Sequence, residues 1–182
     1  MTEDESTLGS DIADQAQPGR TGAHWLVFVG IAAAVVILDQ LTKAWIVSNV
    51  SPGEVIEVIG DFARLILSQN SGALFGLFRD SALLFGVVSL AVIGLIVAYH
   101  ARAGRSLYLS IALGLLLGGA IGNLMDRLRL GYVVDFVDIG IGDLRFYTFN
   151  LGDSAISLAI LMLIAAAIWP ALTEQPGEAQ DG

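Results

Sequence analysis

Four long apolar segments organise this sequence, and more polar stretches separate them. The segments are Trp25–Ile46, Ser81–Tyr99, Leu107–Asn123 and Ser154–Leu172. Each has about 17–22 residues, close to the roughly 20 that an α-helix needs to cross a hydrocarbon layer ~30 Å thick. Because hydrocarbon offers no hydrogen-bonding partner to the backbone, segments of this kind cross it as helices. The pattern therefore predicts four transmembrane helices.

Two of the connecting stretches carry the alternation that is typical of β-strands. The stretch 47–80 contains Glu54–Ile59 and Phe62–Leu67, separated by Gly60 and Asp61, and the stretch 124–153 contains Leu144–Phe149. With an even number of spans, these two stretches share one side of the membrane and both tails share the other. We expect a membrane all-α fold with a small β element on the face opposite the tails.

Composition supports this class. Hydrophobic residues make up 55% of the 182 residues and charged residues only 15%, against about 25% charged in soluble proteins. Most of the net charge of −9 lies in residues 1–23 and 173–182, which we expect to be disordered acidic tails around one domain, 24–172. That domain is nearly balanced in charge, which argues against a nucleic-acid partner. The absence of cysteine excludes disulfides and thiol catalysis.

The distribution of basic residues would place the tails outside the cell. The tail side has three (Arg20, Arg102 and Arg105), whereas the other side has six. Cytoplasmic loops usually carry the excess of Lys and Arg. Lys43 and Arg127 belong to polar motifs at helix ends rather than to free loops, so this count is a weak indicator of orientation.

Polar residues within a span are costly and are functional by default. Asp39 and Lys43 stand four residues apart near the end of the first span, the spacing of an ion pair on one helix face. The pair could take part directly in chemistry. It could equally anchor the helix end, with the Lys43 side chain extending outward to water. We favour the anchoring role.

The third span carries a stripe of small residues followed by a polar cluster. Gly114, Gly118 and Gly122 recur every four residues, which lets a second helix approach closely. Asn123 and Arg127 follow on one helix face. An asparagine and a guanidinium in this arrangement could hold a carboxylate or a peptide carbonyl.

Two aspartates later in the chain have opposed surroundings. Asp135 stands between Val134 and Phe136, and loss of water there favours its protonated form. Asn150 suits the N-cap of the fourth span, which puts Asp153 in the first turn, where the positive helix end favours a charged carboxylate. Such a pair suits general acid–base chemistry on an amide. The plainer interpretation is that Asp153 only caps the fourth helix and that Asp135 is only a turn residue.

Five motifs together resemble the lipoprotein signal peptidase (signal peptidase II) family of bacteria. They are Asp39–Lys43, Asn70–Ala73, Gly118–Arg127, Val133–Phe136 and Phe149–Ser154. They occur in the order of the family, within a four-span layout that covers about residues 25–170.

The resemblance implies an aspartic endopeptidase that removes the signal peptide of diacylglyceryl-modified prolipoproteins just before the lipidated cysteine. It implies Asp135 and Asp153 as the catalytic pair. It also implies a surrounding pocket of Asp39, Asn70, Gly72, Asn123, Arg127 and Asn150, to which we add Lys43. The tails would then be cytoplasmic, with the β element and the active site at the outer face of the bacterial inner membrane. Apart from membrane lipid, no cofactor, metal or obligatory protein partner is implied.

The sequence gives less support to other classes of protein. His24 and His100 both lie on the tail side, so the sequence offers no Ser–His or HExxH zinc site near the polar motifs. A transporter or proton channel would need carboxylates spread through the depth of the membrane, whereas these cluster on one face. A purely structural four-span protein would not need paired aspartates.

Overall fold

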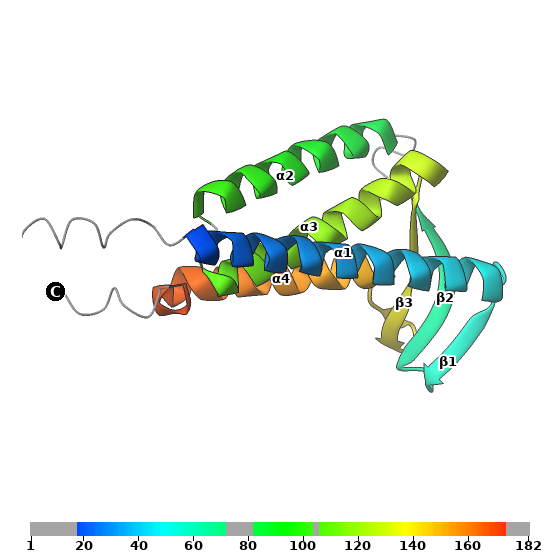
Figure 1. The fold of residues 1–182 in the computed structure, drawn as a ribbon. Helices are drawn as coiled ribbons and strands as arrows, with labels where there is room; N and C mark the ends of the chain where they lie inside the picture. The colour runs from blue at the N-terminus through cyan, green and yellow to red at the C-terminus, as the bar shows by residue number, and fades with distance from the viewer. Residues whose placement is uncertain (1–17, 72–81, 104–105, 174–182) are drawn as a thin grey trace, which may run out of the picture.

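A computed structural model describes residues 18–71, 82–103 and 106–173. It contains four long helices: α1 (Pro18–Asn49), α2 (Ala82–Ala103), α3 (Leu107–Leu130) and α4 (Leu151–Ile168). All four are long and apolar enough to cross a membrane. The four predicted spans are therefore confirmed, and the described ends of the chain lie together at one end of the bundle (Figure 1).

Of the helix ends that differ from the prediction, those of the third and fourth helices have clear physical causes. The third helix continues past Asn123 to Leu130 and ends at Gly131, whose φ of 79° is the left-handed conformation that terminates helices. Asn123 and Arg127 therefore lie on one helix, as their predicted position on one helix face requires. The fourth helix ends at Ile168 instead of Leu172, because a residue before proline is disfavoured in the α conformation. A short 3₁₀ turn, η2 (Pro170–Leu172), follows.

α3 is the central helix, and its glycines explain why. A Cβ at Gly114 would lie 2.8 Å from the carbonyl oxygen of Phe28 on α1, and one at Gly118 would lie 2.6 Å from Cβ of Val35. A Cβ at Gly119 would collide with the carbonyl oxygen of Gly152 on α4. The predicted close approach is confirmed, and it brings α1 and α4 against α3.

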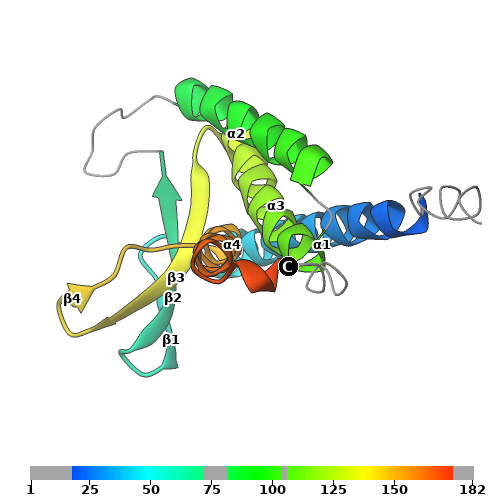
Figure 2. The same cartoon turned by 90° about the vertical axis from the view of Figure 1, so that its left-hand side faces the viewer.

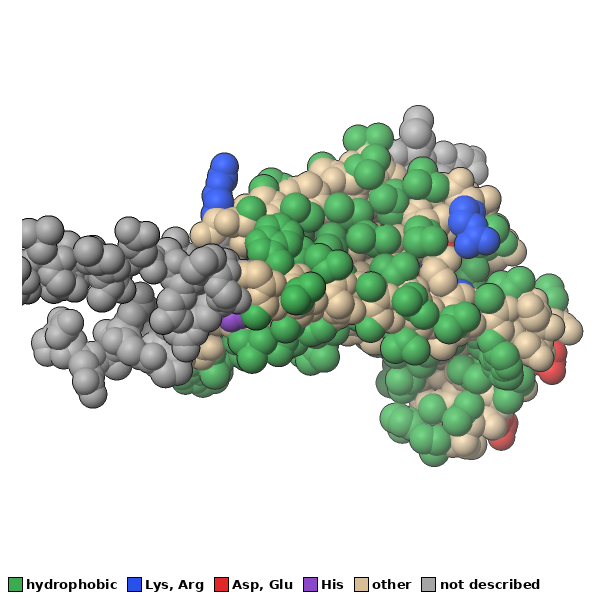
Figure 3. All heavy atoms as spheres, in the orientation of Figure 1, with side chains coloured by type: hydrophobic (Ala, Val, Ile, Leu, Met, Phe, Trp, Pro, Cys, Tyr) green, Lys and Arg blue, Asp and Glu red, His purple; other side chains and the backbone are tan. Residues whose placement is uncertain are grey.

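The outer surfaces of α1, α2 and α4 are apolar. Figure 3 shows hydrophobic side chains over the length of the bundle, and on α4 they include the exposed Leu161 and Ile168. Between the helices, a core forms from Phe28, Ala32, Ile96, Leu113 and Leu117. A protein that is apolar on the outside as well as inside fits a bilayer rather than water.

The sheet stands at the opposite end of the bundle from the described chain ends (Figures 1 and 2). Its four antiparallel strands lie in the order β1 (Val55–Ile59), β2 (Ala63–Asn70), β3 (Val133–Ile141) and β4 (Leu144–Arg145). The first hairpin is confirmed as predicted. Ile56 and Leu65 on its strands pack against Ile46 near the end of α1.

The second half of the sheet differs from the prediction. The expected strand Leu144–Phe149 is reduced to the two residues of β4, although Phe149 still bonds to Val137 of β3. The long strand is β3, which was not expected. Its first four residues are all buried, and a strand buried on both faces lacks the alternation that reveals strands in a sequence.

Candidate active site

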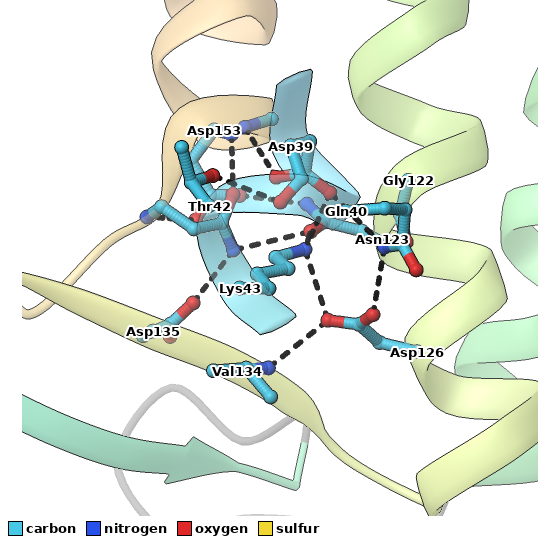
Figure 4. Close-up of polar contacts among 12 residues, drawn as sticks. Asp39, Gln40, Thr42, Lys43, Gly122, Asn123, Asp126, Val134, Asp135 and Asp153 are labelled. Carbon is cyan, nitrogen blue, oxygen red and sulfur yellow. Dashed lines mark hydrogen bonds and ion pairs between the residues drawn. The ribbon is translucent and has the colours of Figure 1, made fainter. Parts of the chain in front are cut away.

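The fold gathers most of the predicted site residues where α1, α3 and α4 meet β3, at the end of the bundle that carries the sheet (Figure 4). α1 supplies Asp39 and Lys43, and α3 supplies Asn123 and Arg127. The remaining contributions are Asn70 at the end of β2, Asp135 on β3, and Asn150 and Asp153 at the start of α4. Gly72 lies outside the described residues.

Lys43 forms a buried ion cluster with two aspartates. Its Nζ lies 2.8 Å from Oδ2 of Asp39 and 2.9 Å from Oδ2 of Asp126, and the Lys43 side chain is only 3% exposed. The predicted pair with Asp39 is confirmed. The Lys43 side chain is buried rather than extended to water, because the second carboxylate, Asp126 from α3, lies inside the protein.

Asp126 and Gln40 are members of this cluster that the sequence analysis did not place in the site. Gln40 donates from Nε2 to Oδ1 of Asp126 at 2.9 Å. Oδ2 of Asp126 accepts the backbone N–H of Val134 at 3.1 Å. Asp126 thus ties α3 to the strand that carries Asp135. Gln40 belongs to the motif Asp39–Lys43 and Asp126 to the motif Gly118–Arg127, and these motifs are the sequence feature that points to both residues.

Asp39 also holds the start of α4. Its Oδ1 accepts the backbone N–H of Gly152 at 2.9 Å, one of the donors that the first turn of a helix leaves unpaired. A Cβ at Gly122 would lie 2.5 Å from Oδ2 of Asp39. Glycine at 122 is therefore what allows Asp39 to lie between α3 and α4.

Asn123 connects the ion cluster to Asp153. Its Oδ1 accepts from Lys43 Nζ at 3.0 Å and from Asn150 Nδ2 at 3.1 Å. Its own Nδ2 donates to Oδ1 of Asp153 at 2.8 Å. All the polar atoms of the Asn123 side chain are thus engaged within the site.

The predicted cap of the fourth helix is present as a full capping box. Asn150 Oδ1 accepts the backbone N–H of Asp153 at 2.9 Å, and Oδ2 of Asp153 accepts the backbone N–H of Asn150 at 3.2 Å. Asn150 Nδ2 also donates to Oδ1 of Asp135 at 2.7 Å. Asn150 therefore contacts both carboxylates and fixes Asp135 near the start of α4.

The surroundings of Asp135 favour its protonated form. Its side chain is buried, and burial raises its pKa to about 6, with the neighbouring charge of Asp153 adding to the rise. Hydrogen bonds from Asn150 and from Asn70 Nδ2, the latter at 3.0 Å, oppose this rise in pKa. Asp153 is partly exposed to solvent. The carboxyl group of Asp135 is thus buried away from water, whereas that of Asp153 lies at a helix N-terminus within reach of water.

Arg127 borders the two carboxylates from α3. Its Nη1 donates to the carbonyl oxygen of Asn123 at 3.2 Å, and its guanidinium lies 5.7 Å from the centre of the Phe85 ring on α2. A planar guanidinium in this position is suited to bind a carbonyl or carboxylate of a ligand.

In the described part of the chain, no three His, Asp or Glu side chains form a group that could hold a metal ion. The carboxylate pair of Asp135 and Asp153 offers acid–base chemistry. The fold and this site define a multi-pass membrane protein with a carboxylate pair at one end of its helix bundle.

Comparisons with known proteins agree with this description of the fold and the site. A family model described as signal peptidase (SPase) II matches residues 31–169. A lipoprotein signal peptidase of Moorella thermoacetica is 41% identical over 145 residues, which are 79% of this chain and 94% of the relative. One from Caulobacter vibrioides is 43% identical over 154 residues, covering 79% and 87%. The chain belongs to the signal peptidase II family.

Two solved structures share the fold, and both are described as bacterial membrane enzymes. One is 29% identical with a TM-score of 0.74, covering 84% of this chain and 94% of its own. The other is 32% identical with a TM-score of 0.72, covering 78% and 92%. The protein is therefore a multi-pass bacterial membrane peptidase.

Proposed function

We propose that this enzyme cleaves the signal peptide from diacylglyceryl-modified prolipoproteins, just before the lipidated cysteine, and that Asp135 and Asp153 perform the chemistry. The observation that carries this assignment is the pair of bonds from Asn150, which hold a buried carboxyl group and a helix-capping carboxylate at one place. Family membership supports the substrate, since the relatives are lipoprotein signal peptidases.

The two aspartates take different roles. Asp153, as the carboxylate, removes a proton from a water molecule whose oxygen attacks the scissile carbonyl carbon. Asp135, in its protonated form, donates its proton to the carbonyl oxygen. When the tetrahedral intermediate collapses, the C–N bond breaks and the proton held by Asp153 passes to the leaving amine. One hydroxyl of the intermediate returns its proton to Asp135 as the carbonyl group re-forms. A positioned general acid or base contributes about 10²–10⁴-fold to a rate.

The neighbouring residues hold this arrangement and the substrate. Asn70, Asn123 and Asn150 orient the carboxylates through the hydrogen bonds described above. Arg127 is placed to bind a substrate carbonyl. Asp39 and Lys43 support these residues by linking α1 to α3 and α4. We assign Gly72 to the pocket on the resemblance alone.

The site belongs near the outer face of the membrane, with the chain ends in the cytoplasm. A signal peptide anchored in the bilayer must be cut where its helix meets the surface, and the carboxylates stand at that end of the bundle. A transport role is less favoured, because Asp39, Asp126 and Asp135 gather at this end instead of forming a relay across the membrane. Bilayer lipid and the substrate are the partners that this role requires.

The test is cleavage by the purified protein in detergent, followed as a gel shift. Two substrates are compared: a prolipoprotein carrying the diacylglyceryl group and the same prolipoprotein without it. We expect cleavage of the first alone, at the bond before the modified cysteine. Cleavage of neither substrate, or a cut at another bond, would refute the assignment.

A further inference from the structure

A surface cavity of about 350 Å³ adjoins Asp153 and takes no part in the mechanism above. It is lined by Phe146, Phe149, Asp153, Ser154 and Ser157. Its volume falls within the ~300–1,000 Å³ of small-ligand sites. Two aromatic rings form one wall, 6.1 Å apart between centroids and nearly perpendicular. The opposite wall is the first turns of α4.

The cavity is continuous with the surface that faces lipid. Ser154 and Ser157 are exposed on α4. Leu161 and Ile164 follow them on the same helix face at spacings of four and three residues, and they are 63% and 50% exposed. A hydrocarbon chain lying along α4 would therefore reach the cavity without leaving apolar surface.

The rim of the cavity that is formed by the hairpin of β3 and β4 is apolar as well. Leu144 is 83% exposed and Phe146 67% exposed. β4 forms the edge of the sheet, which projects beside the bundle in Figure 2. Exposed apolar side chains at the end of a transmembrane helix belong in the lipid interface rather than in water.

We propose that this cavity binds an acyl chain of the substrate's diacylglyceryl group, and thereby places the lipidated residue beside Asp153. The proposal rests on the proposed function, in which the lipidated residue directly follows the scissile bond. That residue lies within one residue length, about 3.8 Å between Cα atoms, of the carbonyl under attack. Its acyl chains must then leave the active site close to Asp153, and the cavity provides an apolar route into the bilayer.

The test fills the cavity with a larger side chain and varies the length of the substrate's acyl chains. Ser157→Leu places a branched side chain in the cavity, whereas Leu161→Phe adds volume one turn further along the same face and serves as the matched control. Each variant is assayed on a dipalmitoyl and a dibutyryl form of one prolipoprotein. Comparing variants on the same substrate removes differences in how the substrates partition into detergent.

We expect Ser157→Leu to raise KM for the dipalmitoyl substrate by about tenfold or more, since each buried methylene is worth roughly fourfold in affinity. The dibutyryl substrate should show little change, and Leu161→Phe should behave as the unaltered enzyme on both. Equal losses on both substrates would overturn the acyl site. Failure of the unaltered enzyme on both substrates would instead refute the proposed function.

A photoreactive group at the end of the acyl chain gives a second measurement that does not depend on turnover. With the Asp153→Asn variant, the modified prolipoprotein should crosslink to Phe146, Phe149 or Ser157. Crosslinking at these residues only by a phospholipid that carries the same group would overturn the assignment to the substrate.

Discussion

Lys43 donates a hydrogen bond to Oδ1 of Asn123 at 3.0 Å, and this bond fixes the direction of the Asn123 amide. An ammonium group can only donate, so it must face the amide oxygen. The NH₂ group of Asn123 is thereby directed to Asp153, at 2.8 Å. A buried lysine side chain thus sets the hydrogen bonding of a proposed catalytic carboxylate.

Lys43→Met should destabilise the protein and abolish cleavage. The substitution leaves Asp39 and Asp126 buried without their cation, and breaking a buried ion pair on one side costs about 3–5 kcal/mol. Thermal unfolding in detergent measures the loss. In the double variant Lys43→Met/Asp126→Asn, one unpaired charge is removed, so the two losses should fall short of additivity. Strictly additive losses would show that the cluster is not energetically coupled.

Asp135→Asn and Asp153→Asn should each lower turnover by at least about 10²–10⁴-fold, because each carboxyl group has its own proton to transfer. Asp143→Asn makes the same chemical change at an exposed residue near β4 and should leave turnover unchanged. Single-turnover cleavage of a lipid-modified prolipoprotein is the measurement. Near-full activity of either dyad variant, in folded protein, contradicts the aspartic mechanism.

The rate should depend on pH in a bell shape. Burial raises the pKa of Asp135 to about 6, so kcat/KM should fall as the pH rises through that value and the required proton is lost. On the acid side it should fall as the pair of carboxyl groups takes up a second proton. Two carboxyl groups this close titrate as a pair, so the profile reports values of the pair.

Asn70→Ala should move the alkaline limb to higher pH. The hydrogen bond from Asn70 stabilises the charged form of Asp135 and lowers its pKa, so its removal raises that pKa. The profile of kcat/KM against pH gives the shift. An alkaline limb that stays in place would exclude Asp135 as the group that titrates there.

Gly122→Ala should disrupt both stability and activity, because the added Cβ would lie 2.5 Å from Oδ2 of Asp39. Gly94→Ala is the matched control on α2, where no atom lies within 4 Å of the added Cβ. In a helix interior the control should be neutral or stabilising by up to about 1 kcal/mol. Equal unfolding temperatures for the two variants would contradict the proposed packing around Asp39.

Cysteine labelling tests the orientation, and the chain has no cysteine of its own to interfere. With a membrane-impermeant maleimide, Glu57→Cys and Asp143→Cys should label in intact cells. Arg102→Cys should label only after the cells are permeabilised. The reverse result would show that the count of basic residues gives the correct orientation.

Features that depend on short stretches of chain could be predicted from the sequence. The four spans follow from apolar length, because the bilayer sets how many residues a helix needs. The capping box of Asn150 and Asp153 and the ion pair of Asp39 and Lys43 follow from spacings of three and four residues within one helix. Local geometry alone brings these groups together.

Only the tertiary structure decided how these local pieces combine. Asp126 meets Lys43, and Asn150 meets Asp135, because the glycines of α3 let α1 and α4 approach it closely. β3 was not predicted because it is buried on both faces and gives no alternating pattern. Contacts between residues distant in sequence depend on how the helices and the sheet pack, and no local spacing in the sequence encodes that packing.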